Sequence, residues 1–235
     1  MNHTARLALA DGAVFRGSAF GATGRRIAQT AEVVFNTAMS GYQESITDPS
    51  YTGQILVFTA PLIGNTGVNE EDVESSKVQV AGMVCRELAQ RPSNFRSTSD
   101  LSEYLARHNA LGIQGIDTRA LTKRLRTTGA MPGITPPPQN TNPITHVPES
   151  ELSDAQLVDA ARKAPSMNGQ NLVPLVGCTN SSRWSETLGE WSPRVGENKS
   201  GGRRFRVLAL DCGAKRNILR NLADRGCDVE VVPHD

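Results

Sequence analysis

The sequence contains few of the residues on which small secreted domains and metalloproteins depend. Its four cysteines are far apart and form no C-x-x-C pair, which argues against both a disulfide framework and a zinc site. Its four histidines share no ligand spacing, so we predict no metal-binding residues in this chain. Unpaired, scattered cysteines fit a reducing compartment, and we expect a cytoplasmic protein.

Aromatic residues are also scarce, and neither sign of charge dominates. Six Phe, three Tyr and two Trp leave most of any core to aliphatic side chains. Lys and Arg number 25 against 24 Asp and Glu, so a formal net charge of +1 offers no broad basic field to nucleic acid. No run of about 18 apolar residues exists, and the N-terminus does not resemble a secretory signal. We therefore expect neither a nucleic-acid partner nor a membrane.

Proline usage divides the chain. Six of the 13 prolines fall within residues 132–148, which predicts a stiff connector or a long loop because proline fixes φ and lacks an N–H donor. A second polar stretch, residues 180–204, predicts a flexible linker. We expect an N-terminal domain over residues 1–131, a connector with one helix and a polar linker over 132–204, and a C-terminal segment over 205–235.

The N-terminal domain is expected to be α+β, with strands early and helices later. The alternation of Leu7 and Leu9 predicts a hairpin with a two-residue turn at Asp11-Gly12. Further strands are expected at residues 32–36, 54–59 and 77–88, and helices at 99–107 and 117–128. Asp117 is a good N-cap for the last helix, and Gly129 ends it.

The connector contains a helix signature and a candidate hairpin. Ser153 followed by Gln156 is a capping box, which predicts a helix that ends before Pro165. Farther along, two tryptophans flank a Leu-Gly pair, Trp184 on one side and Trp191 on the other. This arrangement predicts a hairpin that carries both indole rings.

The C-terminal segment has the pattern of one βαβ unit. Residues 205–210 and 229–232 predict parallel strands. Between them, residues 214–225 predict an amphipathic helix with Ile218, Leu219 and Leu222 on its apolar face. Parallel sheets are stable only between two layers of helices, and a single unit cannot cover both faces of its strands. We therefore expect either a truncated piece of a longer protein or a partner that supplies the missing strands.

Two features of this pattern allow more than one interpretation. Cys212 lies between the first of these strands and the helix, where a helix N-terminus lowers the pKa of a thiol, and His234 is the candidate base for it. The alternative is that Cys212 is a small residue buried in the core. The helix at 117–128 carries four basic residues, Arg119, Lys123, Arg124 and Arg126. They form either a solvated face or a surface for an acidic partner.

Several ordered segments resemble one known family. Residues 32–51, EVVFNTAMSGYQESITDPSY, look like the signature of the small, glutamine-hydrolysing subunit of carbamoyl phosphate synthetase. Other segments that match this family follow in its order: IGNTGVN at 63–69, SNFR at 93–96, GIDTR at 115–119 and DCGAKRNIL at 211–219.

This resemblance implies a fold and an activity. It implies an α/β protein in which a swivelling β/β/α N-terminal domain precedes the first βαβ unit of a doubly wound class I glutaminase domain. Family members hydrolyse L-glutamine with a Cys-His-Glu triad and pass ammonia through a tunnel to the large subunit. That subunit binds ATP and Mg and makes carbamoyl phosphate for arginine and pyrimidine synthesis. We thus expect the large subunit as partner and no cofactor in this chain.

The resemblance also suggests three site residues. Ser50 matches a family serine that helps to bind glutamine, and a hydroxyl with a turn amide suits the carboxylate of an amino acid. A plain β-turn at Asp48-Pro49 is compatible with this role. Asp48 and Lys215 are candidates for the polar mouth through which ammonia leaves, the alternatives being a turn cap and a surface lysine.

The family's catalytic residues have no counterpart in this sequence. The nucleophile of the family lies in a G-x-C-x-G-x-Q turn, and none of the four cysteines lies in G-x-C-x-G. An H-x-E pair is also absent. We therefore assign no catalytic residue and expect the 235-residue chain to be inactive alone. A non-catalytic docking module for the large chain is the alternative function.

Overall fold

The computed structural model describes residues 4–23, 29–135, 152–192 and 205–235. The chain divides into two compact units: the first contains residues 1–47 and 51–169, and the second contains residues 48–50 and 170–235. Both units combine helices with strands, so the fold is mixed α/β. Within the described ranges, every helix is too short or too polar to cross a bilayer.

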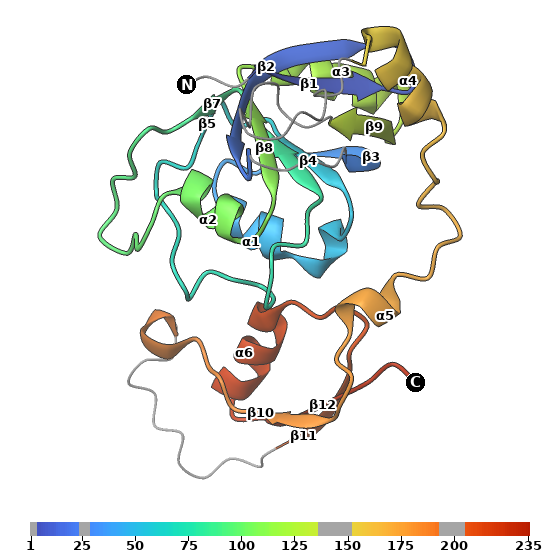
Figure 1. Ribbon diagram of the computed structural model, residues 1–235. Coiled ribbons are helices and arrows are strands. Elements are labelled where there is room, and N and C mark those ends of the chain that lie inside the picture. Colours follow the sequence, from blue (N-terminus) through green and yellow to red (C-terminus); the bar gives the residue numbers. More distant parts are fainter. Residues whose placement is uncertain (1–3, 24–28, 136–151, 193–204) are drawn as a thin grey trace, which may run out of the picture. The chain divides into compact units, whose positions relative to one another are not determined.

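The first unit is built on a closed barrel (Figure 1). Its strands follow the order β1, β2, β8, β6, β4, β3 and β9, and β9 pairs again with β1. The parallel pairs are β3–β4, β4–β6 and β6–β8, and the remaining pairs are antiparallel. The bounds are β1 Thr4–Leu9, β2 Val14–Gly21, β3 Gln29–Asn36, β4 Ile55–Phe58, β6 Gly82–Val84, β8 Leu111–Gln114 and β9 Met131–Thr135.

Helices pack against the strands of the barrel. They are α1 Tyr42–Thr47, α2 Leu101–Arg107, α3 Thr118–Thr128 and α4 Asp154–Arg162. The strand β4 shows the arrangement: Ile55 and Val57 share a cluster with α3, whereas Leu56 and Phe58 share one with α1 and α2. Burial on both faces explains why this strand is a continuous apolar run rather than an alternating one.

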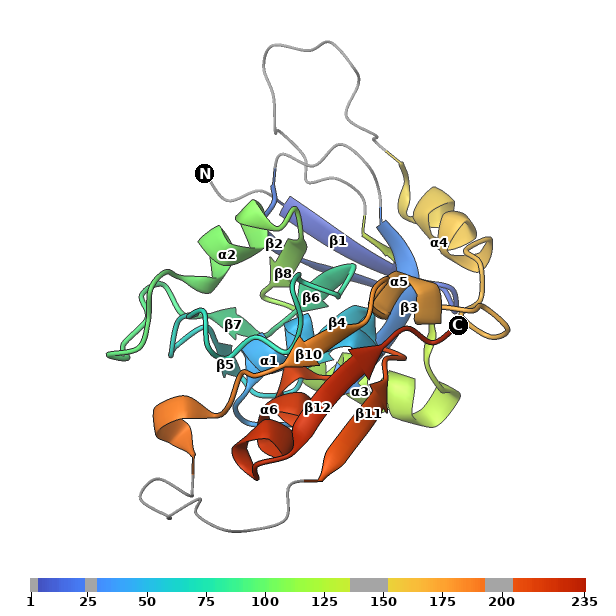
Figure 2. The same ribbon diagram turned by 90° about the horizontal axis from the view of Figure 1, so that it is seen from below.

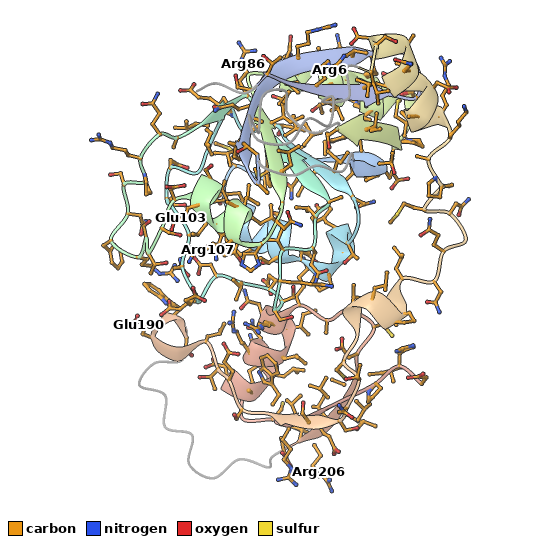
Figure 3. The ribbon with its side chains drawn as sticks, in the orientation of Figure 1. Arg6, Arg86, Glu103, Arg107, Glu190 and Arg206 are labelled. Carbon is orange, nitrogen blue, oxygen red and sulfur yellow. The ribbon has the colours of Figure 1, made fainter. Side chains whose placement is uncertain are left out.

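The helix α4 packs across the neighbouring barrel strands β1 and β9 (Figure 1). Leu157, Val158 and Ala161 form a separate cluster there with Ala8 and Ile134. Arg6, labelled in Figure 3, extends from β1 and donates to Asp154 at 3.0 Å. The helix therefore belongs to the first unit, although the sequence predicted it as part of a connector.

The hairpin and the helix caps confirm several predictions. β1 and β2 pair with Leu7 opposite Phe15, but the connection spans Ala10–Ala13 and is longer than the expected two residues. Asp117 accepts the Ala120 N–H at 2.9 Å, and the predicted capping box of α4 is present. The strand predicted over 77–88 is wrong: only β6 and a short β7, Glu87–Leu88, form there, and β7 pairs with β5, Leu62–Ile63.

The second unit contains a three-stranded sheet with one helix on it (Figure 2). Its strands are β10 Ser182–Trp184, β12 Asp228–Val232 and β11 Arg206–Leu210, in that order, and its helices are α5 Val173–Val176 and α6 Arg216–Asp224. β11 and β12 run parallel with α6 between them in the chain, which confirms the predicted βαβ unit. β10 joins β12 from the other side, antiparallel.

The two sides of this sheet differ in burial. Leu219 of α6 packs with Val229 and Val231, which are nearly inaccessible. On the other face, Leu208 and Leu210 are 69% and 61% exposed. The sheet thus has one covered and one open face, as expected for a single βαβ unit.

Three predictions about this unit are wrong. The predicted Trp184–Trp191 hairpin does not form, because β10 pairs with β12 and residues Gly189–Trp191 form a 3-10 helix. Ile218, assigned to the apolar face of α6, is 54% exposed. Cys212 is exposed rather than buried in a core.

Other predictions concern residues that the structure does not describe. These are most of the proline-rich stretch (136–148), the end of the polar linker (193–204), His3 and His146. The predicted domain limits stay predictions.

Candidate functional site

The candidate site of the second unit begins at the turn between β11 and α6. Asp211 Oδ1 accepts the N–H groups of Gly213 at 3.0 Å and Ala214 at 2.9 Å, and Oδ2 accepts the Cys178 N–H at 2.8 Å. This carboxylate therefore fixes the path of the chain from the strand into the helix. Gly213 has φ +97°, and a Cβ there would lie 2.8 Å from Val176 Cγ2.

Residues 48–50 belong to the same unit and form a tight turn. Asp48 is buried, and its Oδ1 accepts the Ser50 N–H at 2.9 Å. A side-chain oxygen that accepts an N–H two residues on is the turn chemistry that Asp-Pro favours. Ser50 is exposed, and its hydroxyl has no hydrogen bond to any residue that the structure describes.

The side chain of Lys215 joins these two segments. Its Nζ lies 2.6 Å from Asp48 Oδ2, and Lys215 is the N-cap residue of α6. Asp48 is 6% exposed and Lys215 44% exposed, so a buried carboxylate is matched by a cation that still contacts water. The structure thus places all three predicted site residues, Asp48, Ser50 and Lys215, in one cluster.

This cluster presents polar groups at one place, and the described residues show no activated nucleophile in it. Ser50 offers a free hydroxyl, and Lys215 offers a cation whose charge the Asp48 carboxylate already balances. No histidine or carboxylate accepts a proton from the Ser50 hydroxyl within the described residues, so the serine is not activated.

Two of the four cysteines, Cys85 and Cys178, lack the surroundings of a catalytic nucleophile. Cys85 is fully buried, and burial raises the pKa of its thiol to about 12. Burial and the carboxylate of Asp211 raise the pKa of the Cys178 thiol. A nucleophilic cysteine needs the opposite, a lowered pKa in an electropositive site.

The proposed pair of Cys212 and His234 is not formed. In the described part of the chain, neither residue donates a hydrogen bond to the other. His234 Nδ1 is buried without a hydrogen-bond partner, and the carboxylate of Asp235 is 3.8 Å away. A base must lie within hydrogen-bond reach of its nucleophile, so the structure gives no support to a cysteine-dependent enzyme at this point.

No group of three His, Cys, Asp or Glu residues that could hold a metal ion occurs among the described residues. His108 is the one histidine among the described residues of the first unit. Its ring packs on the ring of Tyr104, with the two centroids 4.5 Å apart. Burial is the main cause that lowers the pKa of His108.

Sequence reasoning missed the role of Asp211, although a signal was present. An aspartate at the end of a strand, followed two residues later by glycine, is typical of a turn in which the carboxylate caps nearby N–H groups. Cys212 carried the chemistry expected from the sequence, whereas its neighbour Asp211 organises the turn through its hydrogen bonds.

Comparison with known proteins identifies relatives across almost the whole chain. Residues 7–135 match the family model "Carbamoyl-phosphate synthase small chain, CPSase domain". Proteins named carbamoyl phosphate synthase small chain are similar throughout: 49% identity over 97% of the chain in Syntrophotalea carbinolica, 51% over 97% in Rubrivivax gelatinosus and 48% over 98% in a Nostoc species. The chain spans 56%, 57% and 56% of the lengths of these relatives.

Proposed function

Because the chain belongs to the carbamoyl-phosphate synthase small chain family, we propose that it is part of the subunit that supplies ammonia from glutamine to a large synthetase chain. The observation that carries this proposal is the similarity to small chains of the same name over 97% of the sequence. Carbamoyl phosphate made by the complex then feeds arginine and pyrimidine synthesis.

In this proposal, the Asp48–Lys215 cluster belongs to the path between glutamine and the large chain. Ser50 contacts the substrate through its exposed hydroxyl, and Asp48 and Lys215 line the polar mouth through which ammonia leaves. The ion pair supports this role because it balances both charges, and a neutral molecule then passes without meeting an unpaired charge. The chain itself needs no cofactor, and ATP and Mg are bound by the large chain.

The chain of 235 residues is proposed to bind the large chain without hydrolysing glutamine. The absence of a G-x-C-x-G sequence supports this, as do the raised pKa values of the Cys85 and Cys178 thiols. The closed barrel of the first unit has its own apolar clusters, which favours a second candidate function, a docking module that acts without catalysis.

Two measurements test the proposal. Calorimetric titration of the chain into its cognate large chain is expected to give a saturable complex, and no binding at tens of micromolar would contradict the subunit assignment. A glutaminase assay on the chain alone is expected to release no ammonia. Ammonia release that is lost in Cys212→Ser would show that the chain is an enzyme by itself.

A further inference from the structure

Three segments of the second unit meet around the turn between β11 and α6. They are residues 48–50, 176–178 and 211–215, which all belong to this unit. The proposed function gives roles to Asp48, Ser50 and Lys215 and none to Asp211, the first residue of the turn. A series of contacts nevertheless connects the Asp211 carboxylate to each of those three residues.

The Asp211 carboxylate anchors this turn through backbone N–H groups from two directions. Its Oδ1 accepts from Gly213 and Ala214, and its Oδ2 accepts from Cys178, which lies 33 residues earlier in the chain. The backbone N–H of Asp211 donates to the Val232 carbonyl at 2.8 Å. Hydrogen bonds to an ionised carboxylate are stronger than neutral ones, so the turn is held firmly against both the preceding loop and the sheet.

The turn contacts residues 48–50 at two places. Gly213 packs against Pro49, since a Cβ on Gly213 would lie 3.2 Å from the Pro49 Cβ and 2.8 Å from Val176 Cγ2. Gly213 also has φ +97°, which glycine adopts without strain. Two residues farther on, the Lys215 Nζ lies 2.6 Å from Asp48 Oδ2. The position of the turn therefore determines how residues 48–50 are held.

Lys215 is the link in this series that most needs a fixed backbone. The four-carbon stem of a lysine has many rotamers, and the Lys215 side chain is 44% exposed, so packing alone does not hold it. Asp48 is buried by contrast, and its Oδ1 accepts the Ser50 N–H at 2.9 Å. The ammonium group therefore meets this carboxylate only while residues 213–214 stay in place, and the carboxylate in turn fixes the Ser50 backbone.

We infer that Asp211 is a positioning residue for the substrate contact at Ser50. Asp211 touches no substrate and moves no proton. It holds the N–H groups of residues 213 and 214, and thereby places the Lys215 ammonium group where it pairs with Asp48 and fixes the Ser50 N–H. The role of Ser50 as a substrate contact rests on the proposed function, whereas the dependence of Ser50 on Asp211 rests on the geometry alone.

The test measures the exchange of the Ser50 N–H with water by NMR in the 235-residue chain. Asp211→Asn keeps the shape of the side chain but replaces one oxygen by an NH2 group, which cannot accept from a backbone N–H. The Ser50 N–H is expected to exchange about tenfold faster in this variant, while the amides of β12 keep their wild-type exchange. The matched control is Asp228→Asn, an exposed aspartate at the opposite end of β12, which is expected to leave Ser50 unchanged.

Two further variants show how Asp211 acts. Asp211→Ser keeps a hydroxyl that accepts the N–H two residues on but is too short to reach Cys178, so it is expected to accelerate Ser50 exchange as well. Lys215→Met removes the cation and is expected to have the same effect. If Asp211 acts through Lys215, Asp211→Asn combined with Lys215→Met accelerates exchange by less than the product of the two single effects. The full product would contradict the inference.

The remaining outcomes separate positioning from stability and from the proposed function. Ser50 exchange within twofold of wild type in Asp211→Asn would overturn the inference. Equal acceleration at Ser50 and throughout β12, or failure of both Asp211 variants to fold, would show that Asp211 only stabilises the unit, which also overturns it. If the wild-type chain does not bind the large chain, the subunit assignment falls, but the measured dependence of Ser50 on Asp211 stands.

Discussion

The Nζ of Lys215 lies 2.6 Å from the Oδ2 of Asp48, and the two partners of this ion pair differ in their contact with water. The carboxylate is almost fully buried, whereas nearly half of the lysine side chain is accessible. The residue that remains after one partner is removed is therefore buried in one case and solvated in the other. Loss of Asp48 leaves a lysine that water can solvate, and loss of Lys215 leaves a buried carboxylate that keeps only the hydrogen bond from the Ser50 N–H among those of the described residues.

We predict that Lys215→Met destabilises the second unit more than Asp48→Asn does. The expected losses in the free energy of unfolding are about 2 kcal/mol for Lys215→Met and about 0.5–1 kcal/mol for Asp48→Asn. Urea denaturation followed by tryptophan fluorescence measures this, because both tryptophans lie in the second unit. Equal losses, or a larger loss for Asp48→Asn, would contradict the asymmetry.

The thiols are expected to react at very different rates. At pH 8, a thiol with a pKa of about 12 is ionised roughly a thousand-fold less than an ordinary one, and Cys85 is also shielded from reagent. We expect Ellman's reagent to modify exposed Cys212 quickly in the native chain and Cys85 only after denaturation.

The control for this reaction is Cys212→Ser. This variant is expected to lose the fast phase and to keep the wild-type stability, because the side chain is exposed. A fast phase that persists in Cys212→Ser would mean that another thiol is accessible.

Local signals in the sequence predicted much of the fold. The N-caps at Asp117 and Ser153 depend on a side chain and an N–H three residues away, so the sequence contains all the information they need. The parallel strands β11 and β12 were predicted in the same way, from two apolar runs around an amphipathic stretch.

Pairings between distant segments were not predictable. β9 closes the barrel by pairing Ala31 with Gly133 and Ala8 with Ile134, and nothing near Met131–Thr135 in the sequence marks those partners. The same limitation made the Trp184 hairpin wrong, since β10 pairs with residues more than 40 positions away. Proline density also suggested a connector from residue 132, whereas Pro132 lies in a barrel strand.

The candidate site was predictable only through family resemblance. Asp48 and Lys215 have no spacing that would bring them together on physical grounds, and only the matching segments singled them out. Their place in one cluster agrees with a common role, which stays a prediction. Exposure of Cys212 and of Phe95 could not be inferred from the sequence, because both residue types are usually buried.

The attachment of α4 to the barrel is expected to depend on pH. Hydrogen bonds from Arg6 and then Arg16 hold the pKa of Asp154 below its ordinary value of 3.8. A carboxylate with a lowered pKa stabilises the folded state above its ordinary pKa, and this contribution is lost as the pH falls through the folded value. Hydrogen exchange of the α4 amides is therefore expected to accelerate in Asp154→Asn at pH 6.

The pH profile makes this prediction specific. The difference between wild type and Asp154→Asn is expected to shrink below pH 3.8 and to vanish once the wild-type carboxylate is protonated. Asp159→Asn removes an exposed pair with Lys163 on the same helix and is expected to change exchange little at any pH. A difference for Asp154→Asn that persists at the lowest pH would show that charge is not its cause.

The open face of the sheet in the second unit gives the last prediction. Leu208 and Leu210 are largely exposed on β11, and Leu208 lies in register with Glu230 of β12, which is itself opposite Arg183 of β10. A lysine in place of Leu208 would face this carboxylate across the strands, a favourable pair, and would remove apolar surface from water.

Leu208→Lys is therefore expected to leave the free energy of unfolding within about 0.5 kcal/mol of wild type, and to reduce binding of the dye ANS and aggregation. Val231→Lys is the matched control: the same substitution on the same sheet places a charge on the face under α6, where Val231 is 5% exposed, and is expected to prevent folding. If Leu208→Lys lowers the free energy of unfolding by more than about 2 kcal/mol, this face is covered in solution, because a lysine on an open face stays hydrated.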